Sequence, residues 1–379
     1  MPDRIVVVVG GGVAAQGAVS GLRRAGHTGE VVLIGDEEEP PYQRPPLSKR
    51  YLVEELPRSF LHLPTPDCEL RLGDRVEELE PDAHRVRLAG GDVIEYSSLL
   101  LATGSRPRTL PGYEGAGTLR RVEDAERLRS LLNEDETISI IGAGFIGCEV
   151  AAAARAREVP VRVHDRLDQP MERVLGPELG DLLAEHHRRH GVELRLGSTE
   201  LPEPGERVLV AVGTAPNQEL AERAGIDCDG GVLVDEYGRS SAPGVFAAGD
   251  CARFHSPHFG DRIRIEHFQT AQRHGTAIGR VMAGDETPFA QVPWFWSDQY
   301  DLNLQYLGGG LSWDRLVFRG SIGDPTFTAF QLHEGRVRGV LGWNDGRTVS
   351  QIRRLMDAGV ELDPEKLADP TTDLKQLGR

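Results

Sequence analysis

Three glycines and an aspartate in the middle of the chain have the types and spacing of a phosphate-binding turn. Gly142, Gly144 and Gly147 form a G-x-G-x-x-G pattern directly after a β-branched run. The first glycine permits a tight turn, the second lets a pyrophosphate approach the backbone, and the third lets a helix pack closely on a strand. Asp165 ends the next β-branched run, where a carboxylate can accept hydrogen bonds from ribose hydroxyls.

The elements that must position these residues are also visible. We expect a strand at 138–141, an alanine-rich helix from Cys148 and a second strand at 159–163. The start of such a helix offers free N–H groups and partial positive charge to phosphates. A glycine-rich loop alone would be weak evidence, but the full strand–turn–helix–strand context predicts a dinucleotide site.

A second unit of the same kind opens the chain. The expected strand 4–9 is followed by Gly10, Gly12 and Ala15 in a G-x-G-x-x-A turn, and the strand 30–35 ends at Asp36. Alanine at the third position still permits close helix packing. Two units predict two dinucleotides held against each other; the alternative is that one unit is a relic.

Composition sets the broad class of the protein. The 379 residues suggest two to three domains, and 39% hydrophobic with 27% charged residues is ordinary for a globular protein. No apolar run approaches the ~20 residues of a membrane span, and no secretory signal opens the chain. The net charge of −16 disfavours nucleic-acid and anionic-membrane binding. Four scattered cysteines argue against a redox disulfide or a cysteine zinc site and favour a cytoplasmic protein.

Further motifs carry a family resemblance. The segment 40–52 reads PPYQRPPLSKRYL, 99–104 reads LLLATG, 244–250 reads GVFAAGD, and 293–308 reads PWFWSDQYDLNLQYLG. Together with the two glycine turns, this series resembles the oxygenase-coupled NADH-dependent ferredoxin reductases over nearly the whole chain.

The resemblance implies an α/β fold with two Rossmann-like dinucleotide-binding domains of the glutathione-reductase type and a C-terminal α+β domain. It implies a discontinuous FAD-binding domain at 1–107 and 235–312, an NAD(H)-binding domain at 108–234 and the C-terminal domain at 313–379. Relatives carry a longer β-hairpin in the NAD domain, so we expect a shortened connection around 197–206.

The resemblance also implies the residues of the site. Lys49 and Glu149 are expected to pair near the flavin and to serve the reaction. The expected FAD contacts are Gly10, Gly12, Ala15, Asp36, Arg44, Lys49, Val76, Ala102, Thr103, Gly104, Arg120, Asp250, Phe268 and Trp296. The expected NAD contacts are Gly142, Gly144, Phe145, Ile146, Gly147, Glu149, Asp165, Arg173 and Gly213. Solvated side chains remain alternatives for Lys49 and Arg120, and a plain core role for Trp296.

The implied function is transfer of electrons from NADH through FAD to a [2Fe–2S] ferredoxin, which then serves a cytochrome P450 or a Rieske dioxygenase. Alternatives are a rubredoxin or quinone reductase, or a flavoprotein with a binding role that resembles apoptosis-inducing factor. An acidic ferredoxin would need a local basic patch, for which the candidates are Arg315, Arg319, Arg353, Arg354 and Lys375. The chain is expected to be a monomer or a homodimer.

Two residue groups leave alternatives open. Asp165 favours NADH over NADPH, although the neighbouring Arg166 could accept a 2′-phosphate. His186 and His190 stand four residues apart on an expected helix, 177–190, and could hold a metal. Because no further histidine or cysteine cluster accompanies them in the sequence, a solvated helix face is the favoured interpretation and no metal site is predicted.

Overall fold

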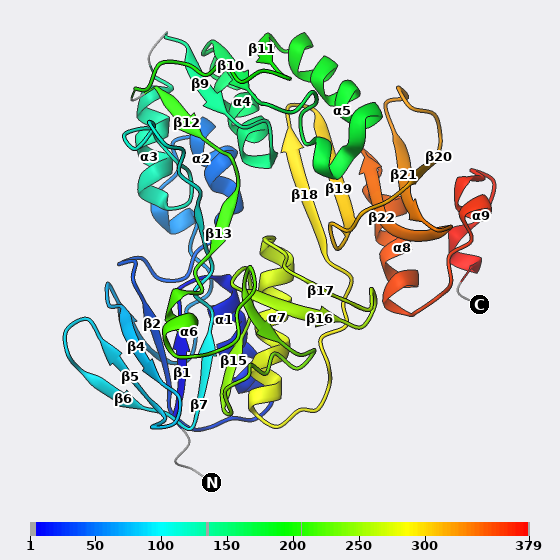
Figure 1. Cartoon of the computed structure of the whole chain (residues 1–379). Coiled ribbons are helices and arrows are strands. Elements are labelled where there is room, and N and C mark those ends of the chain that lie inside the picture. The colour runs from blue at the N-terminus through cyan, green and yellow to red at the C-terminus, as the bar shows by residue number, and fades with distance from the viewer. Residues whose placement is uncertain (1–4, 134–135, 206, 378–379) are drawn as a thin grey trace.

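The computed structural model describes residues 5–133, 136–205 and 207–377, which form three units (Figure 1). The first dinucleotide unit, which contains the N-terminal strand, lies at the bottom of the view, and the central unit lies at the top. The C-terminal unit lies to the right of both. The two expected dinucleotide-binding domains and the C-terminal α+β domain are therefore present.

The first unit is built on a parallel sheet with strand order β15-β7-β1-β2-β3. Its central strand β1 (Val6–Val9) is entirely buried, as an apolar strand covered on both faces must be. The expected start of this strand, Arg4, lies outside the described residues. The other strands are β2 (Val31–Gly35), β3 (Glu69–Leu72), β7 (Ser98–Leu101) and β15 (Val245–Ala247).

Two helices from opposite ends of the chain pack closely within this unit. These are α1 (Val13–Arg24) and α7 (Phe268–Met282). A Cβ on Gly21 would lie 2.1 Å from the Thr276 carbonyl oxygen, and a Cβ on Gly275 would lie 2.0 Å from the Ala14 carbonyl oxygen. The two backbones therefore touch, and a larger residue at either glycine would force the helices apart.

The central unit is a second parallel sheet, with strand order β11-β10-β9-β12. Its strands are β9 (Ile138–Ile141), β10 (Val161–His164), β11 (Val192–Arg195) and β12 (Val208–Val210). Its helices are α3 (Val122–Leu131), α4 (Phe145–Ala156) and α5 (Glu172–Arg189). Helix α5 starts before the expected residue 177, and Gly176 with φ of 73° breaks its first turn from the rest, directly before Pro177.

The connection between β11 and β12 is short. Among its described residues, 196–205 and 207, no helix or strand occurs, in agreement with the expected shortened connection. Glu206, which belongs to that expectation, lies outside the described residues. The connection starts at the carboxyl end of β11, which is the same edge of the parallel sheet at which β9 and β10 reach Gly142 and Asp165.

The C-terminal unit is an antiparallel sheet with strand order β18-β19-β22-β21-β20. Its strands are β18 (Trp294–Gln299), β19 (Leu302–Gly308), β20 (Arg315–Arg319), β21 (Phe327–His333) and β22 (Arg336–Trp343). Helices α8 (Gly346–Asp357) and α9 (Pro364–Ala368) accompany it, with a 3-10 turn η3 (Leu374–Gln376). Because β18 and β19 pair into this sheet, we propose a domain boundary near residue 294 in place of the expected 313.

Smaller elements complete the fold. A small antiparallel sheet contains β4 (Val76–Glu80), β5 (Arg85–Leu88) and β6 (Val93–Glu95). A second small sheet contains β14 (Val232–Val234), β16 (Ala252–Ser256) and β17 (Asp261–Ile263). A two-stranded link joins β8 (Ser105–Pro107) to β13 (Thr214–Pro216). Short helical turns are η1 (Pro45–Ser48), α2 (Arg50–Val53), η2 (Arg58–Phe60) and α6 (Glu219–Arg223).

Among the described residues, no helix combines the length and the apolar character that crossing a membrane requires.

Candidate active site

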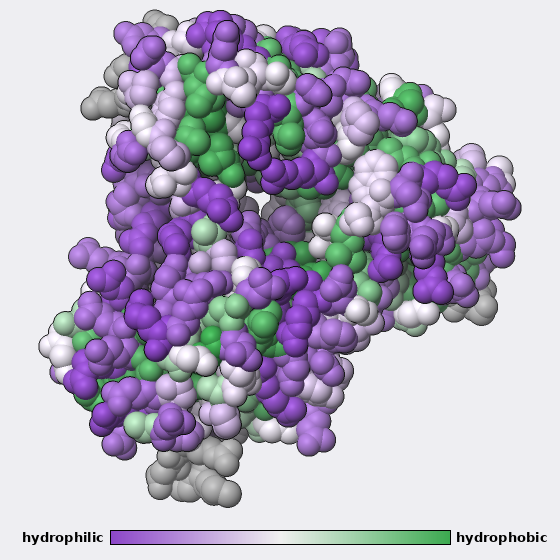
Figure 2. Space-filling model, viewed as in Figure 1, coloured by the Kyte–Doolittle hydropathy of each residue, from purple (hydrophilic) through white to green (hydrophobic). Residues whose placement is uncertain are grey.

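A cavity of about 2340 Å³ opens between the three units (Figure 2). A single small-molecule site usually measures about 300–1,000 Å³, so this cavity can hold two dinucleotides. Of the residues expected at the site, the following line it: Gly10, Gly12, Asp36, Arg44, Lys49, Val76, Ala102, Thr103, Gly104, Arg120, Gly142, Gly144, Phe145, Ile146, Glu149, Asp165, Arg173, Gly213, Asp250, Phe268 and Trp296. Ala15 and Gly147 are not in the lining; each lies at the packed side of its helix.

Both glycine turns are shaped for a ligand. Gly10 and Gly142 have φ of 129° and 111°, and a Cβ on them would lie 2.1 Å and 2.4 Å from a neighbouring carbonyl oxygen. Gly12 and Gly144, which precede α1 and α4, would place a Cβ in open space with no atom within 4 Å. As glycines they offer no capping side chain, so the first N–H groups of both helices remain for a phosphate.

The acidic residue at the second strand of each unit is held in place. Asp165 accepts a hydrogen bond from the Ala143 N–H at 2.7 Å and another from the Leu167 N–H at 2.9 Å. Asp36 forms an ion pair with Arg121. Arg166 is exposed at the rim of the cavity, next to Asp165. Asp165 thus holds the glycine turn against the end of β10, whereas the side chain of the neighbouring Arg166 is exposed to solvent.

Lys49 and Glu149 meet where the first and central units join. The Lys49 Nζ atom lies 2.7 Å from Glu149 Oε2, and their side chains are only 15% and 5% exposed. Ser297 on β18 donates its hydroxyl to Glu149 Oε1 at 2.7 Å, and the Ser48 hydroxyl donates to Oε2. A buried carboxylate is stable only when paired and hydrogen-bonded, and Glu149, on a helix of the central unit, has partners from both other units.

A chain of buried polar groups leads away from this carboxylate. The Gln299 amide donates to the Ser297 hydroxyl at 3.0 Å, and the Gln299 Oε1 atom lies 2.9 Å from His187 Nε2. His187 Nδ1 in turn lies 3.1 Å from the Tyr300 hydroxyl. Ser297, Gln299 and His187 are all buried, so these hydrogen bonds fix β18 against helix α5.

Asp250 lies at the other side of the cavity, at the end of the GVFAAGD segment. It is 8% exposed, and its Oδ2 atom accepts hydrogen bonds from the Ser105 hydroxyl at 3.0 Å and from Arg120 at 2.9 Å. The same Arg120 has a buried Nε atom without a hydrogen-bond partner in the structure. The Asp250–Arg120 pair therefore presents polar groups at the cavity wall, as a site for a hydroxyl-rich ligand requires.

Comparison with known proteins identifies the family of this fold and site. The model of the pyridine nucleotide-disulphide oxidoreductases matches residues 4–275, and that of the reductase C-terminal domain matches residues 294–378. The chain belongs to the pyridine nucleotide-disulphide oxidoreductase family. The second match begins at the first strand of the C-terminal sheet, in line with the boundary proposed above.

Individual members of the family narrow this further. The chain is 34% identical to putidaredoxin reductase of Pseudomonas putida, covering 98% of this chain and 96% of the relative. It is 37% identical to the ferredoxin–NAD(+) reductase component of the anthranilate 1,2-dioxygenase system of Burkholderia cepacia, covering 97% and 98%. The structure of the covalent putidaredoxin reductase–putidaredoxin complex superposes with a TM-score of 0.94, at 33% identity, over 100% of this chain and 98% of that one. The expected resemblance to ferredoxin reductases is confirmed, and the family implies FAD and NADH as cofactors.

Two polar residues of the site, Glu37 and Tyr42, were missed by sequence reasoning, and both contact the expected Arg44. In this oxidoreductase Arg44 NH2 pairs with Glu37 at 2.6 Å, and Arg44 NH1 contacts the Tyr42 hydroxyl at 2.8 Å. Burial alone would raise the pKa of Glu37, but Arg44, Tyr42 and Arg121 outweigh it and lower that pKa. Glu37 and Tyr42 lie beside and within the PPYQRPP segment, and this position was the signal in the sequence that could have marked them as site residues. Their contacts with Arg44 depend on the geometry of the turn, which the sequence does not show.

An aromatic wall closes the cavity on the side of the C-terminal sheet. The Trp296 ring stacks on Trp294 with centroids 5.4 Å apart, and His267 stacks on Phe295 at 3.8 Å. Enclosure of the ring lowers the pKa of His267 to about 4, so it is neutral at physiological pH. Trp296 is half-buried and lines the cavity, so it is part of the site's wall as well as part of the sheet.

The expected basic patch divides into two kinds of residue. Arg319 donates to backbone carbonyls of Leu367 and Asp369 and so holds the C-terminal segment in place. Arg353 instead lies over the Trp294 ring, 5.3 Å from its centroid. Burial together with the neighbouring charge of Arg353 lowers the pKa of Arg273, a residue that sequence reasoning did not include. Arg353 therefore places a positive charge at Trp294, and Arg273 lies close enough to interact with both Arg353 and the Asp357 carboxylate.

Proposed function

We propose that this chain is an NADH-dependent, FAD-containing reductase that passes electrons to a [2Fe–2S] ferredoxin serving a cytochrome P450 or a Rieske dioxygenase. The main observation in support is that both glycine turns line one cavity, and that Lys49 and Glu149 form an ion pair where the two units meet. The names of the similar proteins, a putidaredoxin reductase and a dioxygenase-system reductase, support the same assignment.

The residues of the chain bind and orient the two cofactors. The turn at Gly10 and Gly12 with the start of α1 would hold the phosphates of FAD, and the turn at Gly142 and Gly144 with the start of α4 would hold those of NADH. Bound FAD supplies the ability to accept a hydride from NADH and to release electrons singly. This reaction needs positioning more than acid–base catalysis, and the shared cavity supplies the positioning.

Lys49 and Glu149 set the charge and geometry at the junction. Glu149 holds the Lys49 ammonium at 2.7 Å, and the cavity wall thereby carries a positive charge fixed in one position. A fixed cation in a site closed to water interacts strongly with any negative charge that develops nearby. We propose that this pair stabilises the reduced flavin and aligns the two units.

The cysteines are consistent with direct transfer from flavin to partner. Cys148 and Cys251 are buried, Cys68 and Cys228 are half-buried, and all four are free thiols. Burial raises the pKa of Cys148, which disfavours the reactive thiolate. The chain therefore lacks the redox disulfide of other members of its family, and we propose a reducing, cytoplasmic location.

We propose the surface around Trp294 and Arg353 as the docking surface for the ferredoxin. Aromatic rings here lead from the cavity lining to the outside, and the positive charge of Arg273 and Arg353 complements an acidic partner. The proposed surface is smaller than the basic patch expected from the sequence. It does not include Arg319, because the guanidinium of Arg319 is hydrogen-bonded to backbone carbonyls of the C-terminal segment.

The test of this function uses the purified full-length protein. We expect a yellow protein with one FAD per chain, rapid anaerobic bleaching of the flavin by NADH in stopped flow, and cytochrome c reduction that requires an added [2Fe–2S] ferredoxin. Rapid bleaching with a quinone or rubredoxin as the only effective acceptor would replace the ferredoxin by that acceptor. Very slow bleaching by both NADH and NADPH would overturn the reductase assignment in favour of a binding role.

A further inference from the structure

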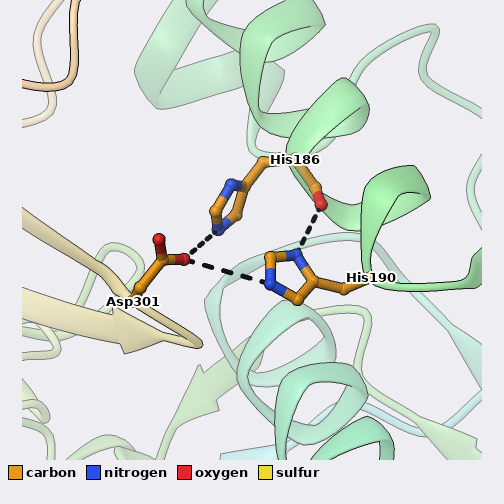
Figure 3. A group of neighbouring side chains, drawn as sticks. All are labelled: His186, His190 and Asp301. Atoms are coloured by element: carbon orange, nitrogen blue, oxygen red, sulfur yellow. Dashed lines mark hydrogen bonds and ion pairs between the residues drawn. The ribbon is translucent and has the colours of Figure 1, made fainter.

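Two histidines near the end of α5 and an aspartate of the β18–β19 turn come together at the surface (Figure 3). His186 Nε2 lies 3.3 Å from Asp301 Oδ1, and His190 Nε2 lies 4.0 Å from the same oxygen. One ligand atom from each residue lies within 4.8 Å of the other two. The sequence offered no further histidine or cysteine cluster for these two histidines, and the fold brings Asp301 to them as a third possible ligand.

The histidine rings are oriented as metal-binding imidazoles usually are. The Nδ1 atom of His190 lies 2.9 Å from the His186 carbonyl oxygen, and this hydrogen bond leaves the Nε2 lone pair directed towards Asp301. A backbone carbonyl on the other ring nitrogen is a frequent support of a histidine ligand. The His190 ring also stacks on Tyr300, with centroids 3.7 Å apart and planes 8° apart, so its direction is fixed.

The second imidazole has a nitrogen that faces Asp301 without a well-formed hydrogen bond. His186 Nε2 is inaccessible to solvent and makes no hydrogen bond of acceptable geometry, although it lies 3.3 Å from Asp301 Oδ1. A buried polar atom without a partner is uncommon in folded proteins and calls for a ligand or an ion. A metal ion between the three residues would satisfy this atom.

We propose that His186, His190 and Asp301 form a Zn²⁺ site that joins the end of α5 to the β18–β19 turn. Two imidazole nitrogens with one carboxylate oxygen, and a fourth position open to water, suit zinc in a tetrahedral arrangement. Bonds of about 2.0 Å place tetrahedral ligands about 3.3 Å apart. The His186–Asp301 separation already has that value, and Asp301, whose side chain is 82% exposed, can move to shorten its 4.0 Å separation from His190. The ligand nitrogens of the two histidines lie within 4.8 Å of each other and would move to the same spacing on zinc binding.

The site lies at the outer end of the buried polar chain. Tyr300, next to Asp301, contacts His187, and the chain continues through Gln299 to Ser297 and Glu149. Zinc at the turn would therefore restrain the strand that also supplies Ser297 and Trp296 to the cavity. The expected effect is a firmer attachment of the central unit to the C-terminal sheet.

Zinc binding is measured on the FAD-loaded, tag-free full-length protein after treatment with a chelator. We expect one Zn²⁺ per chain in competition with a chromophoric zinc indicator, and a raised melting temperature in the presence of Zn²⁺. Co²⁺ should bind at the same place and give the visible bands of a tetrahedral site. His190→Ala and Asp301→Asn, both at partly or fully exposed positions, should each weaken Zn²⁺ binding at least tenfold and abolish the thermal shift.

A matched control is available in the C-terminal unit, which contains Asp301. His333 and Asp314 form a histidine–aspartate pair with Nδ1 and Oδ2 3.4 Å apart, and both side chains are exposed. His333→Ala should leave the zinc affinity and the thermal shift unchanged. Absence of zinc binding by the unaltered protein, or equal binding by the His190 and Asp301 variants, would overturn the proposal.

Discussion

The coupling between Lys49 and Glu149 can be measured with a double-mutant cycle on flavin reduction. Glu149→Gln removes the charge that faces an ammonium 2.7 Å away, in surroundings where the two side chains are 15% and 5% exposed. A hydrogen bond to a charged group contributes about 1.5–3 kcal/mol, so each single substitution should raise the barrier by about 2 kcal/mol. This corresponds to flavin reduction about 30-fold slower, since 1.4 kcal/mol is tenfold.

The double variant distinguishes a pair from two independent residues. If Lys49→Met and Glu149→Gln remove the same interaction, the double variant should be slowed about as much as either single variant. The assay is anaerobic stopped-flow bleaching by NADH, with FAD content determined for each variant. Rate effects that multiply, so that the double variant is slowed about 900-fold, would refute the pairing argument.

An adjacent ion pair provides the control for that cycle. Arg50 and Glu54 are separated by 2.9 Å, nearly the same distance, but their side chains are 61% and 45% exposed. An exposed pair is screened by water and contributes little. Arg50→Ala, Glu54→Ala and their combination should therefore leave flavin reduction unchanged and show no coupling.

Other substitutions test the remaining parts of the protein. NADH should exceed NADPH by about tenfold or more in kcat/KM, because a carboxylate repels a 2′-phosphate. Asp165→Ser should narrow that gap in steady-state diaphorase assays, and an unchanged ratio would place the selectivity elsewhere. Asp250→Ala should weaken FAD binding by about 1–3 kcal/mol, because a buried hydrogen-bonded carboxylate is lost. An FAD titration that gives the same affinity would contradict this role. Burial lowers the pKa of His274 to about 3 from 6.5, so the folded state holds a neutral ring. Its contribution to stability is complete above pH 6.5 and is lost as pH falls towards 3, so His274→Asn should flatten that decline in denaturant unfolding measured against pH. An unaltered acid decline would show that His274 is not its source. Arg353→Glu should slow ferredoxin-dependent cytochrome c reduction and reduce its salt dependence, whereas Arg24→Glu at an exposed end of α1 should do neither. Equal slowing by both would indicate a general charge effect in place of local docking.

The two dinucleotide units could be predicted because their signals are local. Each needs a strand, a glycine turn, a helix and a second strand within about thirty residues, and this pattern can be read directly from the chain. The boundary of the C-terminal unit was harder to predict from the sequence. Strands β18 and β19 directly follow the last helix of the first unit, so their position in the sequence does not show to which unit they belong. Only their pairing with β22 shows that they belong to the C-terminal sheet.

Contacts between distant segments account for what the sequence did not reveal. Ser48 and Ser297 hydrogen-bond to Glu149 from 101 and 148 residues away. Both lie in segments that carry the family resemblance, but nothing in those segments marks the serine as a partner of Glu149. Asp301 likewise reaches the two histidines of α5 only through the fold. The Lys49–Glu149 pair was predictable across a similar distance because the family resemblance supplied it, and the structure brings the two residues together as expected.

The packing of α1 against α7 has a consequence for biosynthesis. The glycine face of α1 leaves the ribosome first, but its partner α7 is encoded roughly 250 residues later. At about 5–20 residues per second, synthesis of the intervening chain takes on the order of 10–50 s. The central unit can fold within that interval, whereas the first unit must wait for its closing helix.

The order of folding is then the reverse of the order of synthesis for the two nucleotide-binding halves. We expect nascent chains truncated before residue 268 to protect the central unit from protease but to leave α1 susceptible. Protection of α1 in such truncated chains would show that it is shielded without α7. A flavin captured only after α7 has docked would be loaded late in synthesis, after residue 282 has left the ribosome.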